Sequence, residues 1–130
     1  MKSIFLFLGA ISAFTGVAMG AFGAHGLKAI LTPEMMAVYQ TGVSYQMWHA
    51  LGLIGVAIIR HLNPASKLLS MAGWLMFLGI ALFSGSLYLL ALLSLSWLGM
   101  VTPFGGACFL VAWLLIASYA ARKPQSKRYA

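Results

Sequence analysis

The sequence is almost devoid of acidic residues. Glu34 is the only Asp or Glu among 130 residues, against eight Lys and Arg, and charged residues make up 7% of the chain. A soluble globular domain carries about a quarter charged residues, so this composition excludes that class. Hydrophobic residues make up 62% of the chain, which excludes a disordered protein, because disorder requires low hydrophobicity. The composition indicates a single-domain integral membrane protein.

The scarcity of acids and cysteines also removes most catalytic and metal sites. The only carboxylate, Glu34, is expected near the outer surface, so the chain offers no paired carboxylates and no Ser-His-Asp set. The single cysteine, Cys108, forms no intrachain disulfide, CxxC pair or zinc site. His25, His49 and His61 fall at three different depths of the expected helices, so no two of them match as axial haem ligands. We therefore expect no enzymatic activity, no metal and no cofactor, although a haem shared with a partner chain stays open.

The basic residues explain the net charge of +7. A basic balance can indicate nucleic acid binding. Here the Lys and Arg residues cluster at the ends of apolar segments instead of along a soluble face. This arrangement is typical of topology signals and of contacts with anionic lipids. We expect anionic membrane lipids as partners and no nucleic acid.

Two apolar segments in the first half are long enough to cross a bilayer. Residues 3–24 carry no charge over 22 positions, about 33 Å as a helix. This segment also resembles a cleaved signal peptide, although it is longer than a usual h-region. A second helix is expected over residues 33–59, because Thr32 can serve as N-cap, Pro33 suits the first helical position and Glu34 favours the helix dipole.

The second half contains a longer uncharged run. Residues 68–121 include 54 positions without Asp, Glu, Lys, Arg or His, and a single helix of that length would measure about 81 Å. The run must therefore fold back on itself. A second Thr-Pro pair, Thr102-Pro103, predicts where the last helix begins. We expect helices over residues 68–94 and 103–121, followed by a basic tail over residues 122–130.

These segments predict an all-α, polytopic membrane protein built as a four-transmembrane-helix bundle. Four spans place both termini and the middle loop on one side of the membrane. Seven basic residues fall on that side and one, Lys28, on the other. The positive-inside rule then predicts that both termini are cytoplasmic. The seven are Lys2, Arg60, Lys67, Arg122, Lys123, Lys127 and Arg128.

Small residues recur at four-residue spacing along the predicted helices. Helices in a bilayer associate by close packing, which small side chains permit. We predict that these positions pack helices together within the chain, while a homo-oligomer interface is the alternative interpretation. The predicted packing residues are Ser12, Gly16, Gly20 and Ala24 on the first helix and Ala81 and Gly85 on the third.

A polar stripe runs along the second predicted helix. Tyr45, Gln46 and His49 are three or four residues apart, so they share one helix face. His49 falls about midway along the span, where exposure to lipid would be costly, so the stripe should face the bundle. Ser84, Ser86 and Tyr88 on the third helix and Ser12 and Thr15 on the first are available partners. The stripe is either interhelical hydrogen bonding or a polar pocket for a ligand.

Four motifs, in order, carry a family resemblance. They read GAFGAHGL (20–27), YQMWHALGL (45–53), LFSGSLYLLAL (82–92) and TPFGGACFLVAW (102–113). They resemble the YgdD-like and YwdK-like bacterial inner-membrane proteins, a domain-of-unknown-function family related to eukaryotic transmembrane protein 256. The resemblance implies four transmembrane helices in the inner membrane and brings no established activity. Ala112 is a departure, because the family usually has glycine there.

The resemblance also suggests a site. It places its motif residues in the outer half of the bundle, where His25 could join the polar stripe in one outward-facing pocket. The candidate pocket residues are then His49, Gln46, Tyr45, His25, Ser84, Ser86 and Tyr88.

Three functions stay open at this point. The first is binding of a lipid or small amphiphile, or service as an accessory subunit of a larger membrane complex. The second is a small homo-oligomeric channel or transporter with a His-lined polar path. The third is a haem- or quinone-associated redox subunit.

Overall fold

The structure, a computed structural model, describes residues 3–122 and is helical throughout that part of the chain, apart from short connections. The all-α prediction is confirmed for these residues. Four continuous helical rods are long and apolar enough to cross a membrane: Ile4–Leu27, Pro33–Leu62, Lys67–Leu93 and Ser96–Ala121. The elements in chain order are α1 (Ile4–Phe22), η1 (Gly23–Leu27), α2 (Pro33–Leu62), α3 (Lys67–Gly79), η2 (Ile80–Ser84), α4 (Gly85–Leu93), η3 (Ser96–Met100) and α5 (Thr102–Ala121).

Side-chain caps set the start of the second and third rods. Thr32 Oγ1 accepts a hydrogen bond from the backbone N–H of Met35 at 3.2 Å, as its N-cap role predicts. Ser66 Oγ accepts from the N–H of Leu69 at 3.3 Å and starts α3. The third rod ends at Ser94, which adopts a left-handed conformation with φ of 55°.

Three helix ends differ from the sequence expectation. The first rod continues past residue 24 to Leu27. The second helix continues past residue 59 to Leu62, so Arg60 lies within its last turn, where a cation is favourable to the helix dipole. Thr102 is not the N-cap of the last helix but its first residue, and Val101 occupies the cap position without a side-chain hydrogen bond. The 3-10 turn η3 comes before it and continues the same rod. Most of the predicted basic tail, residues 123–130, lies outside the described residues.

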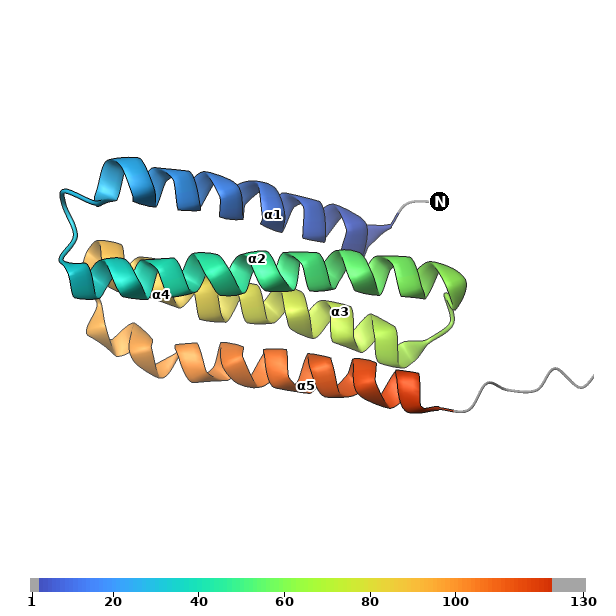
Figure 1. Cartoon of the computed structure of the whole chain (residues 1–130). Helices are drawn as coiled ribbons and strands as arrows, with labels where there is room; N and C mark the ends of the chain where they lie inside the picture. The colour runs from blue at the N-terminus through green and yellow to red at the C-terminus, as the bar shows by residue number, and fades with distance from the viewer. Residues whose placement is uncertain (1–2, 123–130) are drawn as a thin grey trace, which may run out of the picture.

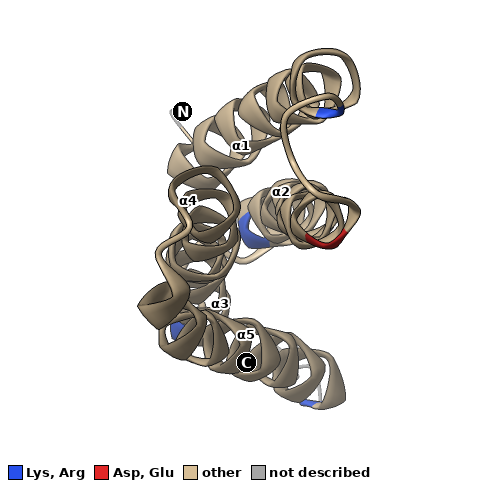
Figure 2. Cartoon of the chain, turned by 90° about the vertical axis from the view of Figure 1, so that its left-hand side faces the viewer, with Lys and Arg blue, Asp and Glu red and all other residues tan. Residues whose placement is uncertain are grey.

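The rods form an open arrangement around α2 and the rod α3–η2–α4. α1 packs mainly against α2, and α5 packs mainly against α3 and η2. α1 and α5 lie on opposite flanks and do not pair with each other (Figures 1 and 2). Large apolar side chains cover the outer surface, including Phe14 and Leu110, as expected for a surface that faces lipid.

The two ends of the bundle carry different segments. The start of α1, the α2–α3 connection and the end of α5 gather at one end, as Figure 1 shows. The opposite end, which faces the viewer in Figure 2, carries the α1–α2 and α4–α5 connections and Glu34 in red. The structure thus groups the segments as the four-span topology requires, while the cytoplasmic orientation of that group stays a prediction.

The structure places the predicted small-residue positions in different surroundings. Ser12 and Gly16 are buried against α2, and a Cβ on Gly20 would lie 3.3 Å from the Val43 side chain. Ala24 and Ala81, however, are exposed. A Cβ on Gly85 would have no neighbour within 4 Å.

Helix geometry accounts for these differences in burial. Steps of four residues advance about 400°, so a strict four-residue repeat drifts by about 40° per step around the helix. The buried face of the first rod instead follows Gly9, Ser12, Gly16, Gly23 and Leu27.

Two π-helical segments, η1 and η2, change the direction of the buried faces. Each inserts one extra residue into a turn, which rotates the residues that follow. The buried residues of this rod include Met76, Ile80, Ser84 and Leu87. Ser84 hydrogen-bonds the Gly42 carbonyl of α2, whereas Ala81 is exposed.

Candidate functional site

Gln46 joins three of the four rods through its amide group. Its Nε2 donates to the carbonyl of Ser12 at 2.9 Å and to Thr15 Oγ1 at 2.8 Å, both on α1. Its Oε1 accepts from the hydroxyl of Tyr88 on α4 at 2.6 Å. Both amide hydrogens are therefore used, and the side chain is only 5% exposed. Gln46 fixes the positions of α1 and α4 relative to α2.

Two hydroxyl groups add further bonds between helices. The hydroxyl of Tyr39 on α2 donates to the carbonyl of Met19 on α1, and its ring lies 5.2 Å from that of Tyr88. Ser84 Oγ donates to the carbonyl of Gly42 at 2.6 Å. All of these groups are partnered within the chain, as buried polar groups in lipid must be.

His49 is held by hydrogen bonds at both ring nitrogens. The indole Nε1–H of Trp113 on α5 lies 3.0 Å from His49 Nε2. Because an indole N–H can only donate, Nε2 must accept, which places the imidazole hydrogen on Nδ1. Nδ1 then donates to the carbonyl of Tyr45 at 2.7 Å. The ring also stacks on Phe109 at 3.5 Å between centroids. This geometry fits the neutral imidazole, since a hydrogen on Nε2 would oppose the Trp113 N–H.

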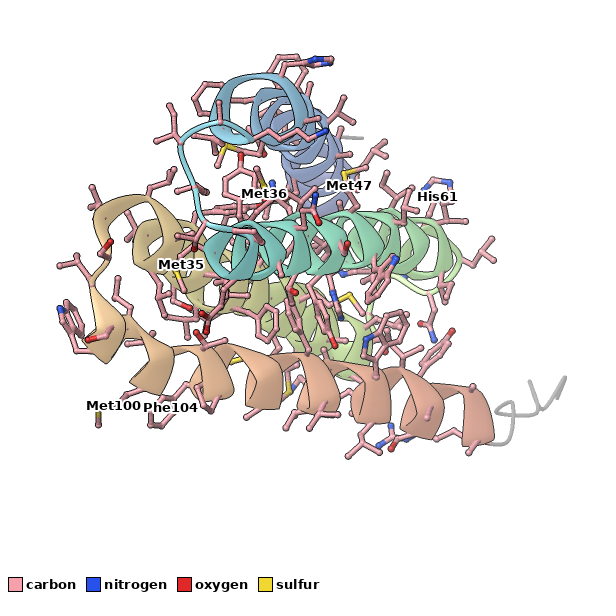
Figure 3. The ribbon with its side chains drawn as sticks, turned by 60° about the vertical axis from the view of Figure 1, so that its left-hand side comes forward. Met35, Met36, Met47, His61, Met100 and Phe104 are labelled. Carbon is pink, nitrogen blue, oxygen red and sulfur yellow. The ribbon has the colours of Figure 1, made fainter. Side chains whose placement is uncertain are left out.

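An aromatic seam connects α2 to the last two rods. Tyr45 lies 4.5 Å from Phe83 and 5.0 Å from Trp48 between ring centroids, and Phe83 lies 5.6 Å from Phe109. Trp48 and Trp113 are 58% and 46% exposed, so the seam reaches the lipid-facing surface. Side chains fill the space between the α2 and α5 ribbons (Figure 3). The aromatic seam comprises Tyr45, Trp48, His49, Phe83, Phe109 and Trp113.

The structure distributes the seven predicted pocket residues among separate groups. Gln46 and Tyr88 share one hydrogen-bond network, and Tyr45 and His49 belong to the aromatic seam. Ser84 Oγ instead donates its hydrogen bond to the Gly42 carbonyl on α2. A ligand-binding role for these residues stays a prediction.

Two of the seven lie elsewhere. Ser86 pairs with Thr102 Oγ1 at 2.6 Å and so joins α4 to α5. His25 lies in η1 at the end of the first rod and is exposed. It was expected in the pocket, but the π-helical turn leaves it outside the buried network.

Sequence reasoning missed Phe109 and Trp113, which complete the seam from α5. Their four-residue spacing puts them on one helix face, a signal that the sequence does contain. This spacing does not stand out in the sequence, because every face of α5 is rich in large hydrophobic residues. Within residues 3–122, the His, Cys and Glu side chains form no group of three or more that could hold a metal ion.

The fold and the buried network define a four-span integral membrane protein that uses its polar side chains to join helices. The family model described as protein of unknown function (DUF423) matches residues 19–106. The chain belongs to this family, and the resemblance read from its motifs is confirmed.

Curated relatives extend the match over nearly the whole chain. It is 46% identical over 119 residues to the UPF0382 membrane protein YwdK of Bacillus subtilis, covering 92% of this chain and 97% of the relative. It is 42% identical over 126 residues to a UPF0382 membrane protein of Haemophilus influenzae, covering 97% and 99% of the two chains. No solved structure matches the chain. The relatives are named as membrane proteins, and the family description assigns no catalytic role.

Proposed function

We propose that the protein binds a lipid or other small amphiphile in the plane of the bilayer, at the aromatic seam. The observation that carries this proposal is the pairing of buried polar groups. Gln46 and His49 have their side-chain nitrogens and oxygen engaged within the chain. The groups left for a ligand are therefore the exposed aromatic faces of the seam, at Trp48 and Trp113. Rings of this kind suit an apolar molecule with a polar tip.

The same pairing gives less support to the alternative functions. A His-lined transport path requires a His49 nitrogen that is free to exchange protons or contact an ion, and axial ligation of haem requires a free nitrogen lone pair. In either case the bond from Trp113 to Nε2 would have to break first. Amphiphile binding at the seam requires no such rearrangement.

Native mass spectrometry of the protein, gently extracted from its own membrane, tests the proposal. We expect the wild type to retain a defined amphiphile and Trp48→Ala to lose it, because this change removes one of the two exposed aromatic rings of the seam. Trp97→Ala is the matched control, since Trp97 is 60% exposed but lies in η3 at one end of the bundle. It should retain the molecule.

Other results would redirect the proposal. Equal retention in wild type and Trp48→Ala would place the ligand elsewhere. A defined protein partner in place of a small molecule would support an accessory subunit. A homo-oligomer with nothing bound, together with ion flux in liposomes, would favour a channel.

We further propose that the protein lies in the inner membrane with both termini cytoplasmic. This proposal is supported by the basic residues at the end of the bundle that carries the termini and the α2–α3 connection. In a Cys108→Ala background, Ala29→Cys and Ala65→Cys place single thiols in exposed connections at opposite ends. We expect a membrane-impermeant maleimide to label residue 29 when applied from outside the inner membrane and residue 65 only after that membrane is opened. The reverse pattern would refute the orientation.

A further inference from the structure

Arg60, in the last turn of α2, holds its guanidinium in an unusual environment. Its Cζ lies 5.5 Å from the centroid of the Phe5 ring on α1. Its Nε is buried and has no hydrogen-bond partner, and among the described residues it is the one buried side-chain nitrogen or oxygen in that condition. A buried donor on a charged group is costly to leave unpaired.

No acidic side chain of this chain can supply the missing partner. Glu34, the only acidic residue, lies in the first turn of α2. Arg60 follows it by 26 residues along one continuous helix, which separates the two by about 39 Å. At that distance the two side chains cannot form an ion pair, which requires a nitrogen–oxygen separation of about 4 Å or less. An anion that pairs with Arg60 must therefore come from outside the acidic side chains of this chain. Such an anion reaches the terminal Nη groups, which are not buried, and does not reach the enclosed Nε.

The length of α2 indicates which anions Arg60 meets. Its 30 residues measure about 45 Å, which is longer than the hydrocarbon core of about 30 Å. The last turn therefore lies at the level of the phospholipid head groups, where phosphate is the abundant anion.

Phe5 holds the guanidinium in a fixed place. The ring is only 1% exposed and packs edge-on against Trp74 at 5.4 Å. It fits closely over Gly73, where a Cβ would lie 2.5 Å from the ring. An aromatic face attracts a guanidinium and leaves the N–H edge free for another partner. The planar fork of that edge matches two phosphate oxygens.

We infer that Arg60 and Phe5 form a binding site for the phosphate of an anionic phospholipid. This site lies at the end of α2, away from the aromatic seam, and goes beyond the function proposed above. Arg60 supplies paired N–H donors and Phe5 orients them. Lys67 and Arg122 lie at the same end of the bundle and are exposed, so they contribute a general positive potential there.

The test measures lipid binding to the purified full-length protein in detergent, by native mass spectrometry during titration with phosphatidylglycerol. We expect Arg60→Gln to weaken binding about ten-fold. This is the smallest loss of affinity expected when hydrogen bonds from a charged group are removed. Arg60→Lys should also weaken it, because lysine keeps the charge but lacks the planar fork. Arg122→Gln removes the same charge from an exposed site at the same end and should weaken binding much less than Arg60→Gln, because it removes only a share of the general positive potential.

Two further measurements distinguish a phospholipid head group from free phosphate as the ligand. Phosphatidylcholine should bind more weakly than phosphatidylglycerol, and inorganic phosphate should not compete at millimolar concentration. Competition by inorganic phosphate would make free phosphate the ligand and overturn the lipid assignment. Equal losses in Arg60→Gln and Arg122→Gln would also overturn it, since they would indicate surface charge alone.

Combining Arg60→Gln with Trp48→Ala separates this inference from lipid binding at the seam. The loss of phosphatidylglycerol binding caused by Arg60→Gln should be the same with and without Trp48. Circular dichroism of each variant checks that the helices are intact. If Arg60→Gln does not fold, a wild-type affinity in folded Arg60→Lys would overturn the role of the planar fork.

Discussion

Replacing Gly105 by alanine is expected to lower the free energy of unfolding by about 3 kcal/mol, at the upper end for an overpacked site. Gly105 is the point at which α5 crosses η2 most closely. A Cβ there would lie 2.8 Å from the Cα of Phe83 and closer still to its backbone nitrogen. Backbone atoms within a helix cannot rotate away as a side chain can, so the two rods would have to separate.

Gly106 provides the matched control one residue later. A Cβ at this position would have only the Phe83 ring nearby, at 3.9 Å, which is ordinary van der Waals contact. Gly106→Ala should be neutral or slightly stabilising, because alanine favours the helix. Unfolding in mixed micelles with increasing sodium dodecyl sulfate, followed by far-ultraviolet circular dichroism, measures both variants. Similar losses at residues 105 and 106 would contradict the close approach of α5 to η2.

The second large effect is expected at Gln46. Gln46→Leu removes three hydrogen bonds that join α1, α2 and α4. Hydrogen bonds between transmembrane helices average about 0.6 kcal/mol each, so we expect a total loss of about 2 kcal/mol. Tyr88→Phe removes only one of the three and should cost correspondingly less. The same micelle unfolding experiment measures these changes.

Gln40→Leu is the control for Gln46, since Gln40 lies on the same helix but is exposed. It should not destabilise the protein. If the two glutamine substitutions have equal effects, the network around Gln46 makes no net contribution to stability. The buried polar stripe would then need another explanation, such as a ligand.

The features that the sequence predicts correctly are those that depend on the residues of a single helix. Apolar length identifies the four spans, because each rod must cross the same hydrocarbon thickness. Thr32 and Pro33 identify a helix start through local backbone chemistry. The inward direction of Gln46 and His49 follows from the cost of exposing polar groups to lipid.

The features that escaped prediction depend on contacts between helices or on a change of helical period. His49 and Trp113 are 64 residues apart, and nothing local to either residue indicates the other. The π-helical segment η2 has no marker in composition or length, and within it Ser84 hydrogen-bonds the Gly42 carbonyl of α2 while Ala81 is exposed. Ala24 was misplaced because a repeat of four residues drifts around a helix of 3.6 residues per turn.

The hydrogen-bonding of His49 has a consequence for how the protein responds to the membrane potential. An elementary charge that moves across 100 mV exchanges about 2.3 kcal/mol with the field. His49 is neutral in this geometry, and between Glu34 and Arg60 the second span has no Asp, Glu, Lys or Arg. The transmembrane field therefore acts on no charged side chain in the middle of α2. The bundle should accordingly keep the same conformation whether or not a membrane potential is present.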